Sequence, residues 1–243
     1  MRILITVDPE IPVPPIGYGG IERIVDGLAK AFFEQGHEVY LLANQESTCK
    51  YAKQIFGWKG KNSSLKNTLT NALQLRKIVA NIKPDVVHSF SRLLYLYPLF
   101  VSSSVKIIQS YQREISPKST GVAYLLSRKR IVFTACAAHL FSRFENKKPW
   151  NSIYNFTDTE YFIPDKGKQR TYFAFLGRIE PIKGTFEAIQ ACIAAKERLI
   201  IAGNIPVEYQ WYFDEKVKPF LEVGKIDYIG VVNDKQKLDL LQS

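Results

Sequence analysis

The sequence is poor in the residues that form disulfides and metal centres. It has three cysteines, Cys49, Cys136 and Cys192, and three histidines in 243 residues. The cysteines are odd in number and far apart, so their spacing fits neither a disulfide framework nor a metal-binding motif. Cys136 and Cys192 lie in apolar runs typical of small core residues. We therefore expect no metal ion, and a reducing compartment such as the cytoplasm.

Long apolar runs are also absent. A transmembrane helix needs about 20 apolar residues, whereas the N-terminal run Arg2–Val7 is followed directly by Asp8, Pro9 and Glu10. This run is too short for a signal peptide and predicts a buried first strand. Any membrane contact would therefore be peripheral, at the inner face.

Acidic residues are outnumbered by basic ones. There are 33 Lys and Arg against 23 Asp and Glu, a formal net charge of +10. This balance favours anionic partners, namely nucleotide phosphates, anionic lipid or nucleic acid. No nucleic-acid recognition motif is present, so we expect no nucleic-acid partner.

Apolar runs and helical periodicity alternate along the chain, which indicates an α/β fold with parallel strands. In the first series, strands are expected at residues 2–7, 38–43, 86–87, 106–111, 130–136 and 152–154, and helices at 20–33 and 65–82. The polar segment 155–170, with Pro164 and Gly167, is interpreted as a linker. In the second series, strands are expected at 172–176, 198–202 and 227–229, and helices at 184–195, up to Leu221, and at 234–241.

The two series predict domains at residues 1–160 and 161–243. The second has about three strands, fewer than a doubly wound domain of roughly 100–150 residues needs, and no strand follows its final helix. We therefore expect a complete N-terminal Rossmann-like domain and an incomplete C-terminal one. An uncovered apolar edge would favour a homo-oligomer.

A first glycine-rich loop, Pro14–Arg23, directly follows the first predicted strand. Glycines at a strand-to-helix turn let the backbone approach a phosphate, and a helix N-terminus offers free N–H groups to an anion. The third glycine of the dinucleotide-binding fingerprint is absent. A loop that only turns the chain fits the same pattern.

A second such loop, Gly177–Gly184, carries two cations. Arg178 can bridge phosphate oxygens and Lys183 adds a point charge, so the pair could neutralise a leaving diphosphate. A solvated surface loop would look alike. Since each loop follows the first strand of its own predicted domain, a cleft between facing domains would hold both.

Taken in order, these segments make the chain resemble the retaining GT-B glycosyltransferases of family 4 over its whole length. The resemblance is carried by Tyr18–Arg23, Gly36–Val39, Pro84–Phe90, Ile153–Asp158, Phe175–Arg178 with Lys183–Gly184, and Ile200–Gly203. It implies a GT-B-like fold, with an acceptor-side first domain and a second domain that binds a nucleotide sugar. It also implies transfer from a nucleotide diphosphate sugar to a saccharide or lipid-linked acceptor with retention of configuration, as in envelope polysaccharide and lipopolysaccharide assembly, without a cofactor.

The resemblance assigns roles to individual residues. The implied catalytic residues are Arg178, Lys183 and Gln112, and the implied donor-binding residues are Gly19, Gly20, Glu22, His88, Arg113 and Gly177. In this family retention is explained by front-face attack, so stabilising the departing diphosphate is the protein's main contribution. Gln112 stands where many members have a histidine; it can hydrogen-bond a sugar hydroxyl but cannot transfer a proton near neutral pH. A structural role fits His88 equally well.

Two further features bear on function. The family's glutamate-containing segment that holds the donor ribose would begin after Leu241 and is absent, so a truncated, catalytically impaired remnant or binding module is an alternative to an active enzyme.

A basic surface is formed by Lys118, Arg128, Lys129, Arg130, Arg143, Lys147 and Lys148, with Trp150 nearby. In this family such a surface often meets anionic lipid, where each charge contributes roughly 1 kcal/mol; an ordinary solvated face fits as well.

Overall fold

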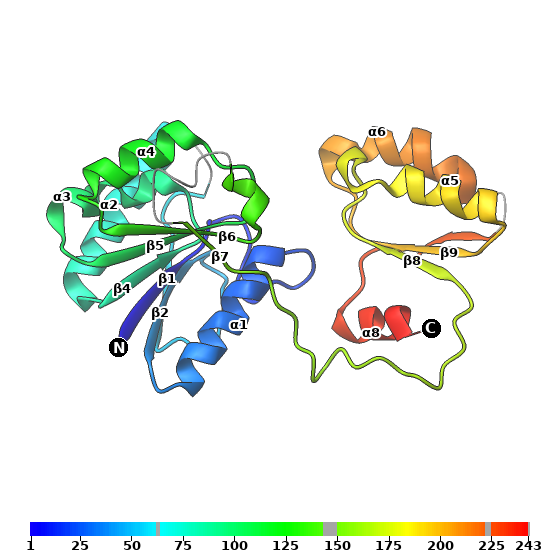
Figure 1. The fold of residues 1–243 in the computed structure, drawn as a ribbon, viewed down its shortest axis with the longest axis horizontal. Coiled ribbons are helices and arrows are strands. Elements are labelled where there is room, and N and C mark those ends of the chain that lie inside the picture. Colours follow the sequence, from blue (N-terminus) through cyan, green and yellow to red (C-terminus); the bar gives the residue numbers. More distant parts are fainter. Residues whose placement is uncertain (62–63, 143–149, 222–224, 243) are drawn as a thin grey trace. The chain divides into compact units, whose positions relative to one another are not determined.

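The computed structural model describes residues 1–61, 64–142, 150–221 and 225–242. The chain divides into two compact units, one of Met1–Pro15 with Gly19–Phe156 and one of Ile16–Tyr18 with Thr157–Ser243 (Figure 1). In both units the described strands pair in parallel. Of the basic residues singled out above, Arg143, Lys147 and Lys148 lie outside the described residues.

The first unit contains a parallel sheet in the order β3-β2-β1-β4-β5-β6-β7. Its strands are β1 (Arg2–Thr6), β2 (Glu38–Ala43), β3 (Gln54–Gly57), β4 (Val86–Ser89), β5 (Lys106–Tyr111), β6 (Ile131–Ala135) and β7 (Trp150–Ser152). The chain runs outward from β1 to β3 and then returns to β4 on the other side of β1. The point between β1 and β4 is therefore a topological switch point, where ligands of such sheets bind beside the carboxyl ends of the strands.

Helices cover both faces of this sheet. The helices are α1 (Gly20–Glu34), α2 (Leu65–Ile82), α3 (Tyr97–Ser102) and α4 (Pro117–Leu126), with 3-10 turns at Leu93–Leu96 and Ala138–Leu140. Figure 1 shows α2, α3 and α4 on one face and α1 on the other. Ser64 is the N-cap of α2, and its hydroxyl accepts a hydrogen bond from the backbone N–H of Asn67. None of the described helices is long and apolar enough to span a membrane.

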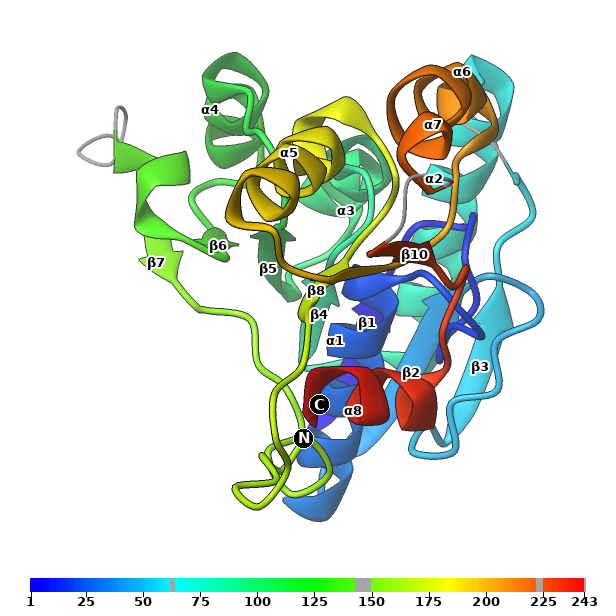
Figure 2. The ribbon, with the colours of Figure 1, turned by 90° about the vertical axis from the view of Figure 1, so that its right-hand side faces the viewer.

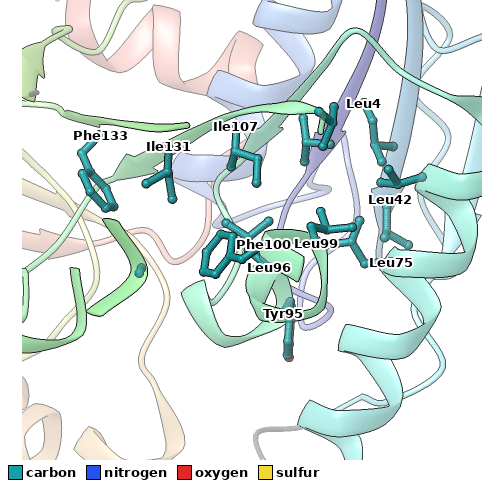
Figure 3. Close-up of a cluster of buried hydrophobic side chains, with 14 of the residues drawn as sticks. Leu4, Leu42, Leu75, Tyr95, Leu96, Leu99, Phe100, Ile107, Ile131 and Phe133 are labelled. Carbon is teal, nitrogen blue, oxygen red and sulfur yellow. The ribbon is translucent and has the colours of Figure 1, made fainter. Parts of the chain in front are cut away.

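The larger core lies between the sheet and α2–α4 (Figure 3). Alternate strand residues such as Leu4, Leu42 and Ile107 point into it and are fully or almost fully buried. Burying each such side chain contributes roughly 1.5–3 kcal/mol. Trp58 closes one end of this core: its indole N–H donates to the carbonyl of Val7 at 2.6 Å.

The second unit has a smaller sheet in the order β10-β9-β8, formed by β8 (Phe173–Leu176), β9 (Leu199–Ala202) and β10 (Ile226–Tyr228). One face is covered by α5 (Thr185–Ala195), α6 (Gln210–Tyr212), a π-helical turn (Phe213–Val217) and α7 (Lys218–Leu221). The other face is covered by α8 (Asp234–Gln242) (Figure 2). Further 3-10 turns lie at Pro181–Lys183 and Val207–Tyr209.

The α/β class with parallel, Rossmann-like sheets is confirmed, but two local predictions were wrong. The strand expected at 152–154 is β7, which begins and ends two residues earlier. Strand β3 was not predicted: it is four residues long and lies at the sheet edge, where its side chains are only partly buried. A short edge strand lacks the apolar run that marks the central strands.

Candidate functional site

In the first unit, the predicted glycine pair lies where β1 leads into α1. Gly19 is the N-cap of α1 and is buried, and a Cβ atom there would lie 2.5 Å from Cβ of Pro15. Gly20 is the first residue of the helix; it is exposed, and a Cβ atom there would meet nothing within 4 Å. Close packing against Pro15 thus requires a glycine at position 19. At Gly20 no such contact exists, and the space beside the backbone is open. Among the described residues no side chain caps this helix end, although the carboxyl group of Glu22 interacts with its own backbone N–H. The other first-turn N–H groups can attract an anion.

Glu22 lies in the first turn of α1 and is only 7% exposed. Burial raises the pKa of its carboxyl group, its own backbone N–H partly offsets that rise, and the charges of Asp8 and Glu10 raise the pKa further. An ionised carboxylate at a helix N-terminus repels a second anion. The protonated form of Glu22 is therefore the one that suits a phosphate bound at this helix end.

Charged side chains gather at the carboxyl ends of β1, β4 and β5, beside the switch point. Asp8 accepts a hydrogen bond from the backbone N–H of Arg92 at 2.9 Å, and its other oxygen lies 3.2 Å from Nη2 of Arg113. Burial raises the pKa of Asp8, although the charge of Arg92 lowers it. Arg92 also pairs with Glu10 and donates to the hydroxyl of Tyr95.

The predicted site residue Arg113 is exposed and pairs with Asp8. The predicted site residue Gln112 directly follows β5 and is half-buried. Neither Asp8 nor Arg92 was assigned a role from the sequence. The signal available was their position, since each comes just after a strand that borders the switch point.

His88 is held inside the sheet. Its Nε2 lies 2.8 Å from the hydroxyl of Ser110, which lies 2.6 Å from that of Thr134, and its ring stacks on Phe90. Burial lowers the pKa of His88 to about 4, so the imidazole is neutral near pH 7. These contacts fit the structural alternative and leave the ring little surface for a ligand.

In the second unit, the loop from β8 to α5 is fixed to the loop that follows β9. The N–H of Gly177 donates to the carbonyl of Ala202 at 3.0 Å, and that of Ile179 to the carbonyl of Asn204 at 2.9 Å. The backbone at Gly203 comes so close that a Cβ atom there would lie 1.7 Å from the carbonyl oxygen of Gly177. The start of the predicted phosphate-binding loop therefore has a defined position.

This loop brings Arg178 and Lys183 to the N-terminal end of α5. Lys183 is exposed at the end of the 3-10 turn, and Gly184, with φ of 77°, is the N-cap of α5. Nη2 of Arg178 lies 2.7 Å from Oε1 of Glu180, which is almost completely buried. Glu180 was not assigned a role from the sequence, because its pairing depends on burial that a loop motif does not reveal.

The polar groups of the site suit an anion better than a metal ion. Among the residues that the structure describes, no three His, Cys, Asp or Glu lie where they could share a metal ion. The loop of the second unit instead offers a guanidinium, an ammonium and an uncapped helix end. These are the groups that bind phosphate oxygens.

Comparisons with known proteins give a family and a fold. A sequence model described as Glycosyltransferase Family 4 matches residues 18–161. A search of curated proteins found no match. Among solved structures, a glycosyltransferase involved in avilamycin A biosynthesis is similar at 23% identity with a TM-score of 0.70, covering 99% of this chain and 66% of that one. A glycosyltransferase from Rickettsia africae is similar at 16% identity with a TM-score of 0.72, covering 96% of this chain and 69% of that one.

Sucrose-phosphate synthase from Thermosynechococcus elongatus is also similar, at 11% identity with a TM-score of 0.75, covering 98% of this chain and 72% of that one. The chain thus spans about two thirds of the length of these structures. At such identities the likeness shows the fold, of the GT-B type. A shared fold does not fix the reaction, which depends on the residues of the site.

Proposed function

The chain belongs to glycosyltransferase family 4, and from that membership we propose that it transfers a sugar from a nucleotide diphosphate sugar to a saccharide or lipid-linked acceptor. In this proposal configuration is retained, and the product belongs to an envelope polysaccharide or lipopolysaccharide. The domain of residues 1–160 takes the acceptor, and that of residues 161–243 takes the nucleotide sugar. The alternative of a non-catalytic binding module has no observation of its own in its favour among the described residues.

The loop from Gly177 to Gly184 carries this proposal. When the sugar leaves, negative charge develops on the nucleotide diphosphate, and fixed positive groups nearby stabilise that charge. Arg178 and Lys183 lie on one short loop whose start is hydrogen-bonded to the loop after β9. The N-terminus of α5 adds the positive end of a helix dipole. Leaving-group stabilisation is therefore the part of the reaction that this unit supports.

The first unit supplies the remaining roles in the proposal. Gly20 leaves room for a phosphate at the N-terminus of α1, because a Cβ atom there would meet none of the described residues within 4 Å. Gln112 hydrogen-bonds the donor sugar, and Arg113 and Glu22 line the donor site. With front-face attack no carboxylate nucleophile is needed, which agrees with the use of Asp8 in ion pairing.

Removing the guanidinium should weaken nucleotide binding strongly. We expect Arg178→Ala to lower the affinity for a nucleoside diphosphate by roughly ten- to a hundredfold, since a hydrogen bond to a charged group is worth about 1.5–3 kcal/mol. The measurement is titration calorimetry of the 243-residue chain with uridine, adenosine, guanosine and cytidine diphosphates.

Arg198→Ala is the matched control. Arg198 is another ion-paired arginine of the second unit, 2.8 Å from Asp227, but it precedes β9 and so lies at the amino end of that strand. Its loss should leave the affinity within about twofold, in keeping with the small net contribution of an exposed ion pair. Equal losses in the two variants, or unchanged affinity in Arg178→Ala, would contradict the assignment.

The basic surface supports the proposal of peripheral contact with anionic lipid, but with fewer cations than the sequence suggested. Lys118, Arg128 and Lys129 are exposed on or just after α4. Arg130 is not available, because its guanidinium donates to backbone carbonyls, among them that of Phe100. Exposed apolar side chains accompany the cations on this helix: Val122, Leu125 and Leu126. Cations beside exposed apolar groups suit a negatively charged bilayer surface.

Neutralising two of these cations should reduce lipid binding. We expect Arg128→Gln with Lys129→Gln to bind vesicles containing phosphatidylglycerol roughly thirtyfold more weakly, since each charge contributes about 1 kcal/mol. Arg76→Gln with Lys77→Gln is the matched control, because these neighbours are also exposed but lie on α2. Co-sedimentation with anionic and with neutral vesicles measures the effect; binding that is equal for both vesicles would contradict the proposal.

A further inference from the structure

The donor loop contains a carboxylate that the proposed reaction does not use. Glu180 is 2% exposed, and its Oε1 lies 2.7 Å from Nη2 of Arg178. A charged carboxylate is buried only where a partner compensates it. The guanidinium of Arg178 is that partner. The side chain proposed to bind the diphosphate is therefore already held on one side by the protein.

The backbone holds this carboxylate in place from both directions. Before it, Ile179 is completely buried, and its N–H donates to the carbonyl of Asn204 at 2.9 Å. After it, the carbonyl of Glu180 accepts a hydrogen bond from the N–H of Lys183 at 3.0 Å. Glu180 is therefore a rigid anchor, whereas a long arginine side chain by itself has many rotamers.

Donor groups beside this ion pair lack an acceptor. In the part of the chain that the structure describes, Nε of Arg178 and Oγ1 of Thr185 are buried and have no hydrogen-bond partner, and Oε1 of Glu180 contacts Nη2 of Arg178 as an ion pair without forming a hydrogen bond. Thr185 is completely buried and is the first residue of α5, whose N-terminus is capped by no side chain of the described residues. Buried polar groups are normally satisfied. A ligand with several anionic oxygens, such as a diphosphate, would satisfy these donors together.

We propose that Glu180 is a positioning residue for Arg178. It holds one nitrogen of the guanidinium so that the other N–H groups face a diphosphate at the N-terminus of α5, and it does not touch the ligand itself. The inference rests on the proposed function, because it takes the nucleoside diphosphate as the ligand of Arg178. A fixed guanidinium loses less conformational entropy on binding than a free one, which strengthens binding.

Three variants measured by calorimetry with nucleoside diphosphates test this role. Glu180→Ala should lower the affinity about tenfold, which corresponds to the loss of one well-placed charged hydrogen bond. Glu180→Gln should lose at most about threefold, since an amide oxygen at the same place keeps a polar contact with the guanidinium. Glu197→Ala, which removes an exposed carboxylate just beyond the C-terminal end of the same helix, should change the affinity by less than about twofold.

The decisive measurement repeats Glu180→Ala in the Arg178→Ala background. A residue that acts through Arg178 has nothing left to position there, so the affinity should change by less than about twofold. An equal loss in both backgrounds, or a lower melting temperature with unchanged affinity, would overturn the inference. Should Glu180→Ala fail to fold, the loss caused by Glu180→Gln must vanish in the same background.

The same set of variants distinguishes a failure of this inference from a failure of the proposed function. If Arg178→Ala leaves the affinity unchanged, the proposed donor site is wrong. If Arg178→Ala weakens binding and Glu180→Ala does not, the donor site stands and only the positioning role is wrong.

Discussion

Gly203→Ala is expected to destabilise the second unit by roughly 2–5 kcal/mol or more. A Cβ atom at this position would lie 1.7 Å from the carbonyl oxygen of Gly177 and 2.7 Å from its carbonyl carbon. Backbone cannot move aside as a flexible side chain can, and hydrogen bonds hold both segments: Gly177 donates to Ala202, and Gly203 to Gly230. Overpacking costs roughly 1–3 kcal/mol or more, and the positive φ of 152° adds roughly 1–2 kcal/mol for a residue with a Cβ atom.

The control is Gly230→Ala in the same unit. Gly230 also has a positive φ, of 75°, but a Cβ atom there would meet nothing within 4 Å. We therefore expect a loss of only about 1–2 kcal/mol, from the backbone conformation alone. Urea unfolding followed by circular dichroism measures both, and similar midpoints for the two variants would contradict the close approach. Since Gly203 positions Gly177, the first variant should also lose nucleotide binding.

Acidification from about pH 6.5 to pH 4 is expected to remove roughly 3 kcal/mol of stability through His88 alone. Burial lowers the pKa of this imidazole to about 4 in the folded protein, against about 6.5 in an unfolded chain. Above pH 6.5 neither state binds the proton, so stability does not change. Between the two values the unfolded state binds more protons, and stability falls by roughly 1.4 kcal/mol per pH unit as the pH falls. Below pH 4 the loss is complete.

The pH dependence of the free energy of unfolding, compared between the protein and His88→Gln, isolates this effect. The buried carboxyls of Asp8 and Glu22 have raised pKa values, so they act in the opposite direction and add stability on acidification. Since both variants contain them, their contribution disappears in the difference. His139→Gln is the control, because His139 is exposed. If the His88→Gln protein loses stability as steeply as the wild type, the imidazole is not buried in its neutral form.

Elements with strong local signals could be predicted from the sequence to within a residue. Strand Glu38–Ala43, strand Lys106–Tyr111 and helix Leu65–Ile82 begin and end where expected. In each, apolar periodicity and the residues at the ends agree, so short-range physics is sufficient. Strand β3 was missed because an edge strand takes its conformation from the neighbour with which it pairs.

The sequence by itself determined the α/β class, the two glycine-bearing loops and the cations of the second loop, because a strand, a turn and a helix N-terminus are each encoded within a few residues. Tertiary structure alone decided which groups compensate those charges. Asp8 meets Arg113 across 105 positions, and Gly203 meets Gly177, because parallel strands distant in sequence end at one edge of a sheet. Glu180 is only two residues from Arg178, yet its pairing also depended on the fold, since burial is what makes that ion pair necessary.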